Sequence, residues 1–385
     1  MHICVISMDY PSPGYPVYTF VEQLCVGLTK QGCKVSVIAP QNVMNILKGK
    51  RRKINFIRKQ KVEDGEITIY SPFTITGYSI PVIGKCINKV AGFVTRCYMR
   101  KHKITPDVYY SHFWRAGLWV YQEAKRNGKP LFVASGESSI ALKNNSKYVN
   151  DYCNYVKGVI CVSTKNKYES IQNGLTTAEK CVVIPNAIDN KLFYQKDKLT
   201  LRKKFAFPND AFIVAFVGYF SKRKGSDRVS ESIKQINDPE IKSIFIGSDS
   251  GENAIPTCDG ILYKGRVNHN QIPDYMNCAD VFVLPTLREG CCNAIIEAMA
   301  CGLPVISSDK DFNYDILDDT CSIMITPTNI NEISEAIKSL KENPVLCEKL
   351  SKGALEKANS LTISNEKDKW NEFYENIIIH DKFYV

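Results

Sequence analysis

The chain has 385 residues, of which 44% are hydrophobic and 23% charged, a composition typical of soluble globular proteins. Its length is too great for one ordinary core and predicts two domains of roughly 150 to 200 residues, and no apolar run approaches the ~20 residues that a membrane-spanning helix needs. The net charge of +10 belongs to the first half alone, where residues 1–190 carry 26 basic and 12 acidic side chains, against 24 and 28 in residues 191–385.

The first half of the chain alternates strand-like and helical segments. Its opening residues, MHICVIS, enter a strand-like run without the basic region of a signal peptide, so we expect a cytoplasmic protein. Further strand-like runs cover residues 34–39, 66–71, 107–111, 130–135, 158–163 and 180–185, with helical patterns between most of them, such as Val17–Lys30 and Trp114–Arg126. Such alternation predicts a parallel sheet with helices on both faces.

The second half repeats this scheme. Its strand-like runs cover residues 212–220, 241–247, 260–265, 280–285 and 304–308, with helices expected at Asp227–Ile236 and Asn293–Cys301. The first series breaks off in residues 183–193, VIPNAIDNKLF, which contain turn-forming residues. We therefore predict two doubly wound domains, residues 1–190 and 191–365.

Residues 366–385 are predicted to form a terminal helix. An apolar stripe with helical spacing runs along them, made of Trp370, Phe373, Tyr374, Ile377 and Ile378. The spacing is compatible with packing on either domain, and we assign the helix to the N-terminal domain.

A basic stretch, KGKRRKINFIRKQK, covers residues 48–61. It holds eight basic and no acidic side chains, with Ile54, Phe56 and Ile57 interleaved. This pattern predicts a surface that lies on anionic lipid, where each basic group adds roughly 1 kcal/mol. A solvated loop is the plainer alternative, and nucleic-acid binding is disfavoured because no nucleic-acid motif accompanies the charge.

Residues 288–304, REGCCNAIIEAMACGLP, place two glutamates at a predicted helix mouth. The strand-like run 280–285 ends just before them, Asn293 is a suitable N-cap, and Gly302 with Pro304 supplies the stop. Ligands of open α/β sheets lie beyond the carboxyl ends of the strands. The backbone N–H groups of Cys292, Asn293 and Ala294 are therefore expected to bind a phosphate.

The two carboxylates fit this anion site only if they contact other parts of the same ligand. Glu297 is suited to accept two hydrogen bonds from a ribose diol, and Glu289 to meet the hydroxyls of a second sugar or a developing positive charge. Together they outline a sugar nucleotide. The alternative is a helix-capping carboxylate beside an unrelated surface glutamate.

At this point the sequence resembles a known family. LPTLREGCCNAIIEAMACGLPVISSD is similar to the Glu-x7-Glu signature of retaining glycosyltransferases of family 4, which include bacterial polysaccharide and lipopolysaccharide sugar transferases. In the order of the chain, the further similar segments are YPSPGYPVYTFVEQL, PDVYYSHFWRAG, VIPNAIDNKLF, FVGYFSKRKGSDRV and LYKGRVNHNQIPDYMNCADVFVLPT. The resemblance implies the GT-B fold, in which two Rossmann-like domains face a central cleft.

The resemblance also implies an activity and its partners. The enzyme would move a sugar, with retention of configuration, from a nucleoside-diphosphate sugar (a UDP or GDP sugar) to a hydroxyl of a glycan or lipid-linked saccharide. The acceptor would bind the first domain at the inner face of the cytoplasmic membrane, during cell-surface polysaccharide synthesis. A sugar-nucleotide epimerase or hydrolase on the same fold, or a non-catalytic membrane-surface protein, remains the alternative.

Residue roles follow from the matching motifs. Lys224 corresponds to the family's diphosphate lysine, followed by an N-cap at Ser226 or Asp227, and Arg223 would compensate for the family arginine that Tyr219 replaces. The resemblance assigns His112 to the transferred sugar or acceptor hydroxyl, and Glu137 stands where a second histidine is common. The other residues expected to bind the donor are Gly14, Gly218, Arg266, Val267, Gly290 and Cys291.

The two glutamates are expected to divide their roles. Glu297→Ala should chiefly weaken nucleotide affinity, whereas Glu289→Ala should lower turnover and leave nucleoside diphosphate binding nearly intact.

Neither a metal nor a cofactor is expected. The fifteen cysteines form no Cys-x-x-Cys pair, so they predict reduced thiols rather than zinc ligands or disulfides. The family needs no bound metal, and we interpret the Asp-x-Asp sequence at residues 309–311 as a surface feature.

Overall fold

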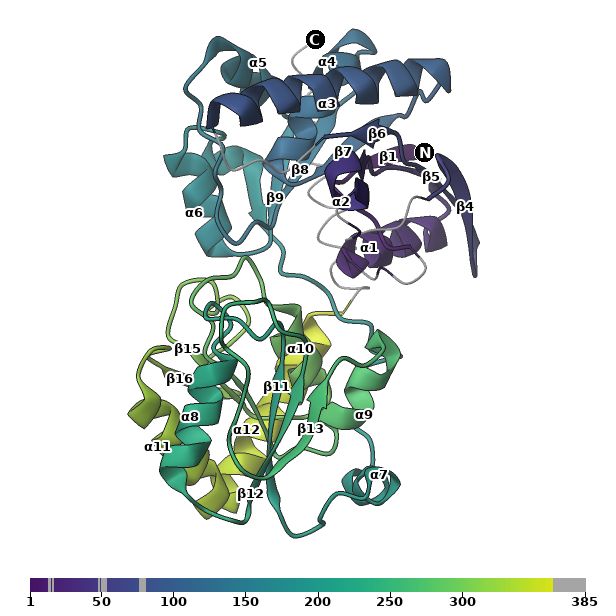
Figure 1. Cartoon of the computed structure of the whole chain (residues 1–385). Coiled ribbons are helices and arrows are strands. Elements are labelled where there is room, and N and C mark those ends of the chain that lie inside the picture. The colour runs from purple at the N-terminus through teal and green to yellow at the C-terminus, as the bar shows by residue number, and fades with distance from the viewer. Residues whose placement is uncertain (13–14, 16, 48, 50–53, 76–80, 363–385) are drawn as a thin grey trace. The chain divides into compact units, whose positions relative to one another are not determined.

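The computed structural model describes residues 1–12, 15, 17–47, 49, 54–75 and 81–362. They divide into two compact units, one spanning Met1–Ile184 and one beginning at Pro185 (Figure 1). The division falls inside the predicted breaker segment, six residues before the boundary predicted after residue 190. The helix predicted at residues 366–385 lies outside the described residues, as does Gly14.

The first unit is built on an eight-stranded sheet in the order β10-β9-β8-β7-β1-β2-β5-β4. Every neighbouring pair is parallel except β4 with β5. The strands are β1 (His2–Ile6), β2 (Lys34–Ile38), β4 (Ile57–Val62), β5 (Gly65–Tyr70), β7 (Val108–His112), β8 (Leu131–Ser135), β9 (Gly158–Cys161) and β10 (Cys181–Val183), and a separate short pair joins β3 (Gln41–Asn42) to β6 (Phe73–Thr74).

Helices cover both faces of this sheet. They are α1 (Thr19–Lys30), α2 (Val43–Leu47), α3 (Pro81–Lys101), α4 (Trp114–Arg126), α5 (Lys147–Tyr155), α6 (Thr164–Gln172) and the 3-10 turn η1 (Ala178–Lys180). Strand β1 is buried on both sides, because Cys4 and Ile6 join the apolar cluster under α3, α4 and α5 while Ile3 and Val5 join the cluster under α1. This explains why the strand is a continuous apolar run rather than an alternating one.

The second unit contains a six-stranded parallel sheet in the order β13-β12-β11-β14-β15-β16. Its strands are β11 (Phe212–Val217), β12 (Ile241–Ile246), β13 (Ile261–Gly265), β14 (Val281–Leu284), β15 (Val305–Ser308) and β16 (Ser322–Ile325), and its helices are α7 (Lys198–Phe205), α8 (Ser226–Ile236), η2 (His269–Gln271), α9 (Ile272–Met276), α10 (Asn293–Ala300), α11 (Ile330–Glu342) and α12 (Pro344–Ser360). Helix α8 packs on α11, and α10 packs on α12 (Figure 1).

Both sheets have a topological switch point, where the strand order reverses direction. Numbered within its own unit, the second sheet runs 3-2-1-4-5-6, the order of dinucleotide-binding Rossmann folds. Its switch point lies between β11 and β14. In the first unit the reversal lies between β1 and β7. In open α/β sheets ligands bind beyond the carboxyl ends of the strands at such a point, which here are those of β11 and β14 in the second unit and of β1 and β7 in the first.

The strands predicted from the sequence are present, with ends shifted by at most three residues. The predicted helix Trp114–Arg126 matches α4, and the others match α1, α8 and α10 within two residues. The loop alternative for the basic stretch is wrong for its last residues, because residues 57–62 form the edge strand β4, whereas the lipid-facing surface stays a prediction. This strand pairs with β5 and carries four polar side chains in succession, residues 58–61, which hides it from a search for apolar runs. Within the described residues, no helix is both long and apolar enough to span a bilayer.

Candidate active site

The switch point of the second unit brings together two loops that carry charge. The loop after β11 leads through Arg223 and Lys224 into α8, and the loop after β14 leads through Glu289 into α10. Leu287 N–H donates to the Arg223 carbonyl at 2.8 Å, so the two loops are joined by backbone as well as by side chains. Residues far apart in the sequence thus share one crevice.

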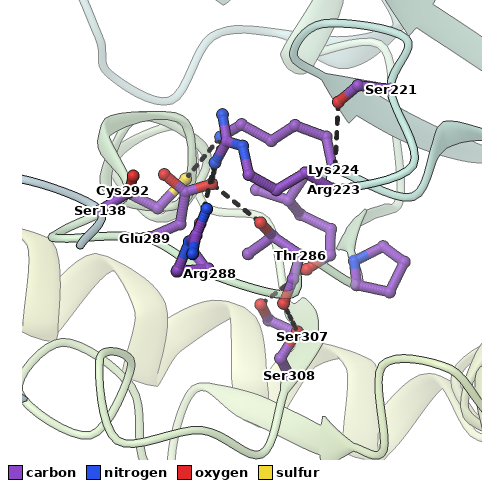
Figure 2. Close-up of polar contacts among 12 residues, drawn as sticks. Ser138, Ser221, Arg223, Lys224, Thr286, Arg288, Glu289, Cys292, Ser307 and Ser308 are labelled. Carbon is purple, nitrogen blue, oxygen red and sulfur yellow. Dashed lines mark hydrogen bonds and ion pairs between the residues drawn. The ribbon is translucent and has the colours of Figure 1, made fainter. Parts of the chain in front are cut away.

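Glu289 is the centre of this site (Figure 2). Its Oε1 lies 2.6 Å from Arg223 Nη1 and 2.8 Å from Lys224 Nζ, and it accepts the hydroxyl hydrogen of Thr286 at 2.8 Å. Arg223 Nη1 also donates to the Arg288 carbonyl at 2.8 Å. Lys224 Nζ lies 3.7 Å from the sulfur of Cys292. The structure therefore brings Arg223, Lys224, Glu289 and Cys292 together.

Electrostatics keep this cluster ionised although it is largely buried. Burial would raise the pKa of Glu289, but Lys224 and Arg223 outweigh it and hold that pKa below its usual range. Burial would likewise lower the pKa of Lys224, but Cys292 and Glu289 outweigh it and raise that pKa. One carboxylate thus faces two cations, and the cluster carries a net positive charge that suits an anionic ligand.

Glycines allow the loops to approach so closely. Gly225 has φ 79° and is the N-cap of α8, so the N-cap predicted at Ser226 or Asp227 is wrong by one or two residues. A Cβ at Gly225 would lie 2.9 Å from the Pro285 carbonyl oxygen, and only glycine combines this φ with that contact. Gly218 donates its N–H to Ile246 at 2.9 Å and has its carbonyl oxygen against Gly247.

The mouth of α10 differs from the prediction in its cap. Cys292 is the N-cap and Asn293 is the first helical residue. The Asn293 side chain does not cap the helix, because its Oδ1 accepts a hydrogen bond from Asn186 Nδ2 at 2.6 Å. Asn186 belongs to the breaker segment that opens the second unit, so this bond ties the start of the unit to the helix mouth. The flanking Gly290 is buried, while Cys291 and Ala294 are half-buried.

The second glutamate of the pair, Glu297, lies one turn inside α10 and is buried. Its Oε1 lies 3.2 Å from His269 Nε2 on η2.

The other predicted donor residues lie after β13. Val267 packs against the core of the unit. Arg266 is exposed, and its carbonyl oxygen accepts the Tyr263 hydroxyl hydrogen at 2.9 Å. The sequence interpretation missed Thr286, Asn186 and His269, although each lies in a segment that carries the family resemblance.

The switch point of the first unit holds His112, the last residue of β7. Its ring lies between those of Phe20 and Phe113, at centroid distances of 4.9 Å and 4.5 Å. Burial lowers the pKa of His112 to about 3, so the imidazole is neutral at pH 7. Its Nδ1 has no hydrogen-bond partner among the described residues.

Beside this strand end lies a cavity of about 350 Å³, lined by Tyr18, Phe113, Arg115, Glu137 and neighbouring residues. Phe113, the N-cap of α4, offers no side-chain acceptor. Glu137 substitutes for it from the loop after β8, accepting the Trp114 N–H at Oε1, at 2.8 Å. Burial raises the pKa of Glu137 to about 7. A titrating carboxyl group thus borders a cavity at the crevice of this unit.

These two Rossmann-like units define the class of the protein as GT-B. The solved structure of Anabaena Alr3699/HepE in complex with UDP matches with a TM-score of 0.73 at 17% identity, over 98% of this chain and 100% of that chain. At this low identity the likeness shows the fold alone.

The family follows from the sequence comparisons. The model described as "Glycosyltransferase Family 4" matches residues 17–192, and the model described as "Glycosyl transferases group 1" matches residues 197–357. The chain therefore belongs to the glycosyltransferases of family 4, which confirms the resemblance to that family stated above.

Relatives with printed functions match over most of the chain. TuaC of Bacillus subtilis (strain 168), assigned by its name to teichuronic acid biosynthesis, is 27% identical over 363 residues, covering 88% of each chain. The Escherichia coli UDP-Gal:alpha-D-GlcNAc-diphosphoundecaprenol alpha-1,3-galactosyltransferase is 23% identical over 363 residues, covering 87% of this chain and 92% of its own.

Proposed function

We propose that this glycosyltransferase moves a sugar, with retention of configuration and without a catalytic metal, from a UDP sugar to a hydroxyl of a lipid-linked saccharide in cell-surface polysaccharide synthesis. The observation that carries the proposal is the cluster of Arg223, Lys224 and Glu289 at the switch point of the second unit. UDP is preferred over GDP because the E. coli relative is named for a UDP-sugar donor and the Anabaena structure contains UDP. The lipid-linked acceptor follows the name of the same relative.

In this proposal the second unit, within residues 191–365, binds the donor diphosphate. Negative charge grows on the leaving phosphate as the bond to the anomeric carbon breaks, and preorganised cations at that position are the largest catalytic term available. Lys224 and Arg223 supply the cations. The N–H groups of residues 292–294 add the positive end of the α10 dipole. Gly218, Gly290, Cys291, Arg266 and Val267 form the surrounding backbone of the donor site.

Glu289 and Glu297 contact the two sugars of the donor. Glu297 accepts the ribose hydroxyls. Glu289 faces the transferred sugar, where its negative charge stabilises the positive charge that develops at the anomeric carbon. Because Glu289 is held by three donors, it needs no reorganisation when this charge appears.

The first unit, within residues 1–190, binds the acceptor. The cavity bordered by Glu137 has room for part of a saccharide and presents a carboxyl group to its hydroxyls. The neutral imidazole of His112 can exchange a hydrogen bond with a sugar hydroxyl without a charge being introduced. Gly14 is retained as a proposed contact of the donor.

The test is a transfer assay with the full chain, a panel of UDP and GDP sugars, and a bacterial lipid extract. Radiolabel from a UDP sugar should appear in lipid, and Lys224→Met should abolish it. Glu231→Gln, a change on the exposed part of α8, is the matched control and should leave transfer intact. Isomerised or hydrolysed donor without a lipid product would favour the epimerase or hydrolase alternative. Failure to bind any nucleotide sugar would refute an enzymatic role.

We further propose that the first unit contacts the anionic inner face of the cytoplasmic membrane. Its exposed large apolar side chains include Leu47, Phe56, Ile57, Val90 and Phe93. The Phe56 carbonyl accepts the Tyr98 hydroxyl of α3 at 3.4 Å, so Phe56 of the basic stretch lies next to α3. Apolar groups flanked by lysine and arginine suit an anionic interface.

Vesicle sedimentation tests this contact. The protein should bind vesicles of phosphatidylglycerol and be released by salt, and Phe93→Ser should weaken binding. Tyr168→Ser changes an equally exposed aromatic residue on α6 and should have no effect. Equal binding to neutral phosphatidylcholine vesicles would show that the basic charge plays no part.

A further inference from the structure

One contact in the second unit has no part in the mechanism described so far. His269 Nε2 lies 3.2 Å from Glu297 Oε1, and the two side chains come from different elements, η2 and α10. The Glu297 side chain is 11% exposed and that of His269 is 31% exposed, so the contact lies at the edge of the crevice rather than in free solvent.

The imidazole of His269 is held from two directions. The ring of Phe193 meets it edge-on at a centroid distance of 5.3 Å, and Phe193 is itself buried. The backbone of η2 is fixed by a capping box, in which Asn268 and Gln271 bond to each other's main chain. The histidine is therefore a fixed donor rather than a mobile surface side chain.

The chemistry of the pair determines the direction of the hydrogen bond. A carboxylate accepts hydrogen bonds, so this contact is a hydrogen bond in the tautomer that carries its proton on His269 Nε2. A free glutamate side chain has several torsions and loses considerable entropy when it is fixed. A donor bound to Oε1 restricts these torsions before any ligand arrives and leaves the second oxygen available.

We propose that His269 is a positioning residue that sets the preference of the donor site for ribose over deoxyribose. By donating to Oε1, it holds the Glu297 carboxylate in the orientation that accepts both hydroxyls of the ribose. The inference rests on the proposed function, since it requires that Glu297 contact ribose. It adds a residue whose effect is on sugar recognition and not on the diphosphate.

The experiment measures affinities by titration calorimetry for UDP, GDP and their 2′-deoxy counterparts, using the full chain. In the unchanged protein, the ribonucleotide should bind roughly tenfold more tightly than the deoxyribonucleotide, as expected for one hydrogen bond to a charged group. His269→Ala should reduce this ratio at least threefold, mainly by weakening the ribonucleotide. His269→Gln, which retains a donor, should restore part of the ratio. The control Asn270→Ala, on the exposed side of the same turn, should not change it.

A second measurement keeps the inference separate from a general structural role. The effects of His269→Ala and Glu297→Ala on the ratio should not add, because each breaks the same contact. Equal weakening of ribo- and deoxyribonucleotide in His269→Ala would overturn the inference and leave the proposed function intact. An unchanged protein that binds neither UDP nor GDP would instead overturn the proposed function. A normal nucleotide affinity without ribose preference would refute the Glu297–ribose contact and this inference with it.

Discussion

Glu289→Gln tests whether Glu289 competes with the donor for the two cations. In the structure the carboxylate contacts Arg223 and Lys224, at 2.6 Å and 2.8 Å, and neutralises part of the positive charge that a ligand anion would meet. The glutamine keeps the shape and one oxygen but removes the charge. We therefore expect UDP to bind more tightly and turnover to fall, which differs from the expectation from sequence that nucleoside diphosphate binding stays nearly unchanged.

The size of the effect follows from the geometry. A phosphate oxygen that contacts Lys224 from its other side would lie about 5–6 Å from the Glu289 oxygen, and at an effective dielectric constant of about 20 each unit of charge is then repelled by about 3 kcal/mol. This corresponds to roughly a hundredfold in affinity. The Arg223 side chain is 36% exposed, so solvent screens part of this repulsion. We therefore expect the affinity for UDP to rise by at least about tenfold. Turnover should fall roughly a hundredfold, as when a preorganised electrostatic group is removed.

Calorimetric titration with UDP and steady-state transfer assays measure the two effects separately. Glu231→Gln changes net charge equally on the exposed part of α8 and controls for long-range electrostatics. If UDP binds tenfold more weakly to Glu289→Gln, the carboxylate serves mainly to hold the cations in position, and the competition argument fails.

Other predictions concern stability. Burial raises the pKa of Glu137 in the folded protein to about 7, from an ordinary value of 4.5. As pH rises, the Glu137 carboxyl therefore ionises first in the unfolded chain. Between these two pH values the free energy of unfolding falls by roughly 1.4 kcal/mol per pH unit. Glu137→Gln should therefore raise the melting temperature at pH 8 much more than at pH 4.5, and an equal gain would contradict this. Gly353→Ala places a Cβ 2.0 Å from the Thr320 carbonyl oxygen and should cost about 2–3 kcal/mol in urea unfolding, whereas the exposed Lys352→Ala should cost under ~0.5 kcal/mol.

The sequence predicted the fold well where apolar runs are continuous. Strands such as β1 and β11 are buried on both faces, so composition alone identifies them. It failed for β4, whose described backbone pairs with one neighbouring strand, β5, and whose residues are mostly charged or polar. Edge strands are specified by pairing, which no single segment of sequence contains.

In the site, too, residues within local motifs could be predicted from the sequence, whereas contacts between distant segments could not. The charged residues of the two loops were predictable, because motif spacing places them at helix mouths. The capping residues were not. Cys292 rather than Asn293 is the N-cap of α10, and the Asn293 oxygen instead accepts a hydrogen bond from Asn186, over a hundred residues earlier. The contact between His269 and Glu297 was likewise hidden, because it joins two elements 28 residues apart.

The second unit begins and ends at one point. Ile188 N–H donates to the Leu361 carbonyl at 2.8 Å, and Ile188 pairs with Thr362 in a parallel bridge. A unit whose ends meet behaves like an inserted module, because its chain leaves and rejoins the rest of the protein at one place. We therefore expect the second unit to tolerate circular permutation, and, if it binds the donor as proposed, its exchange between relatives should pair one donor specificity with another acceptor.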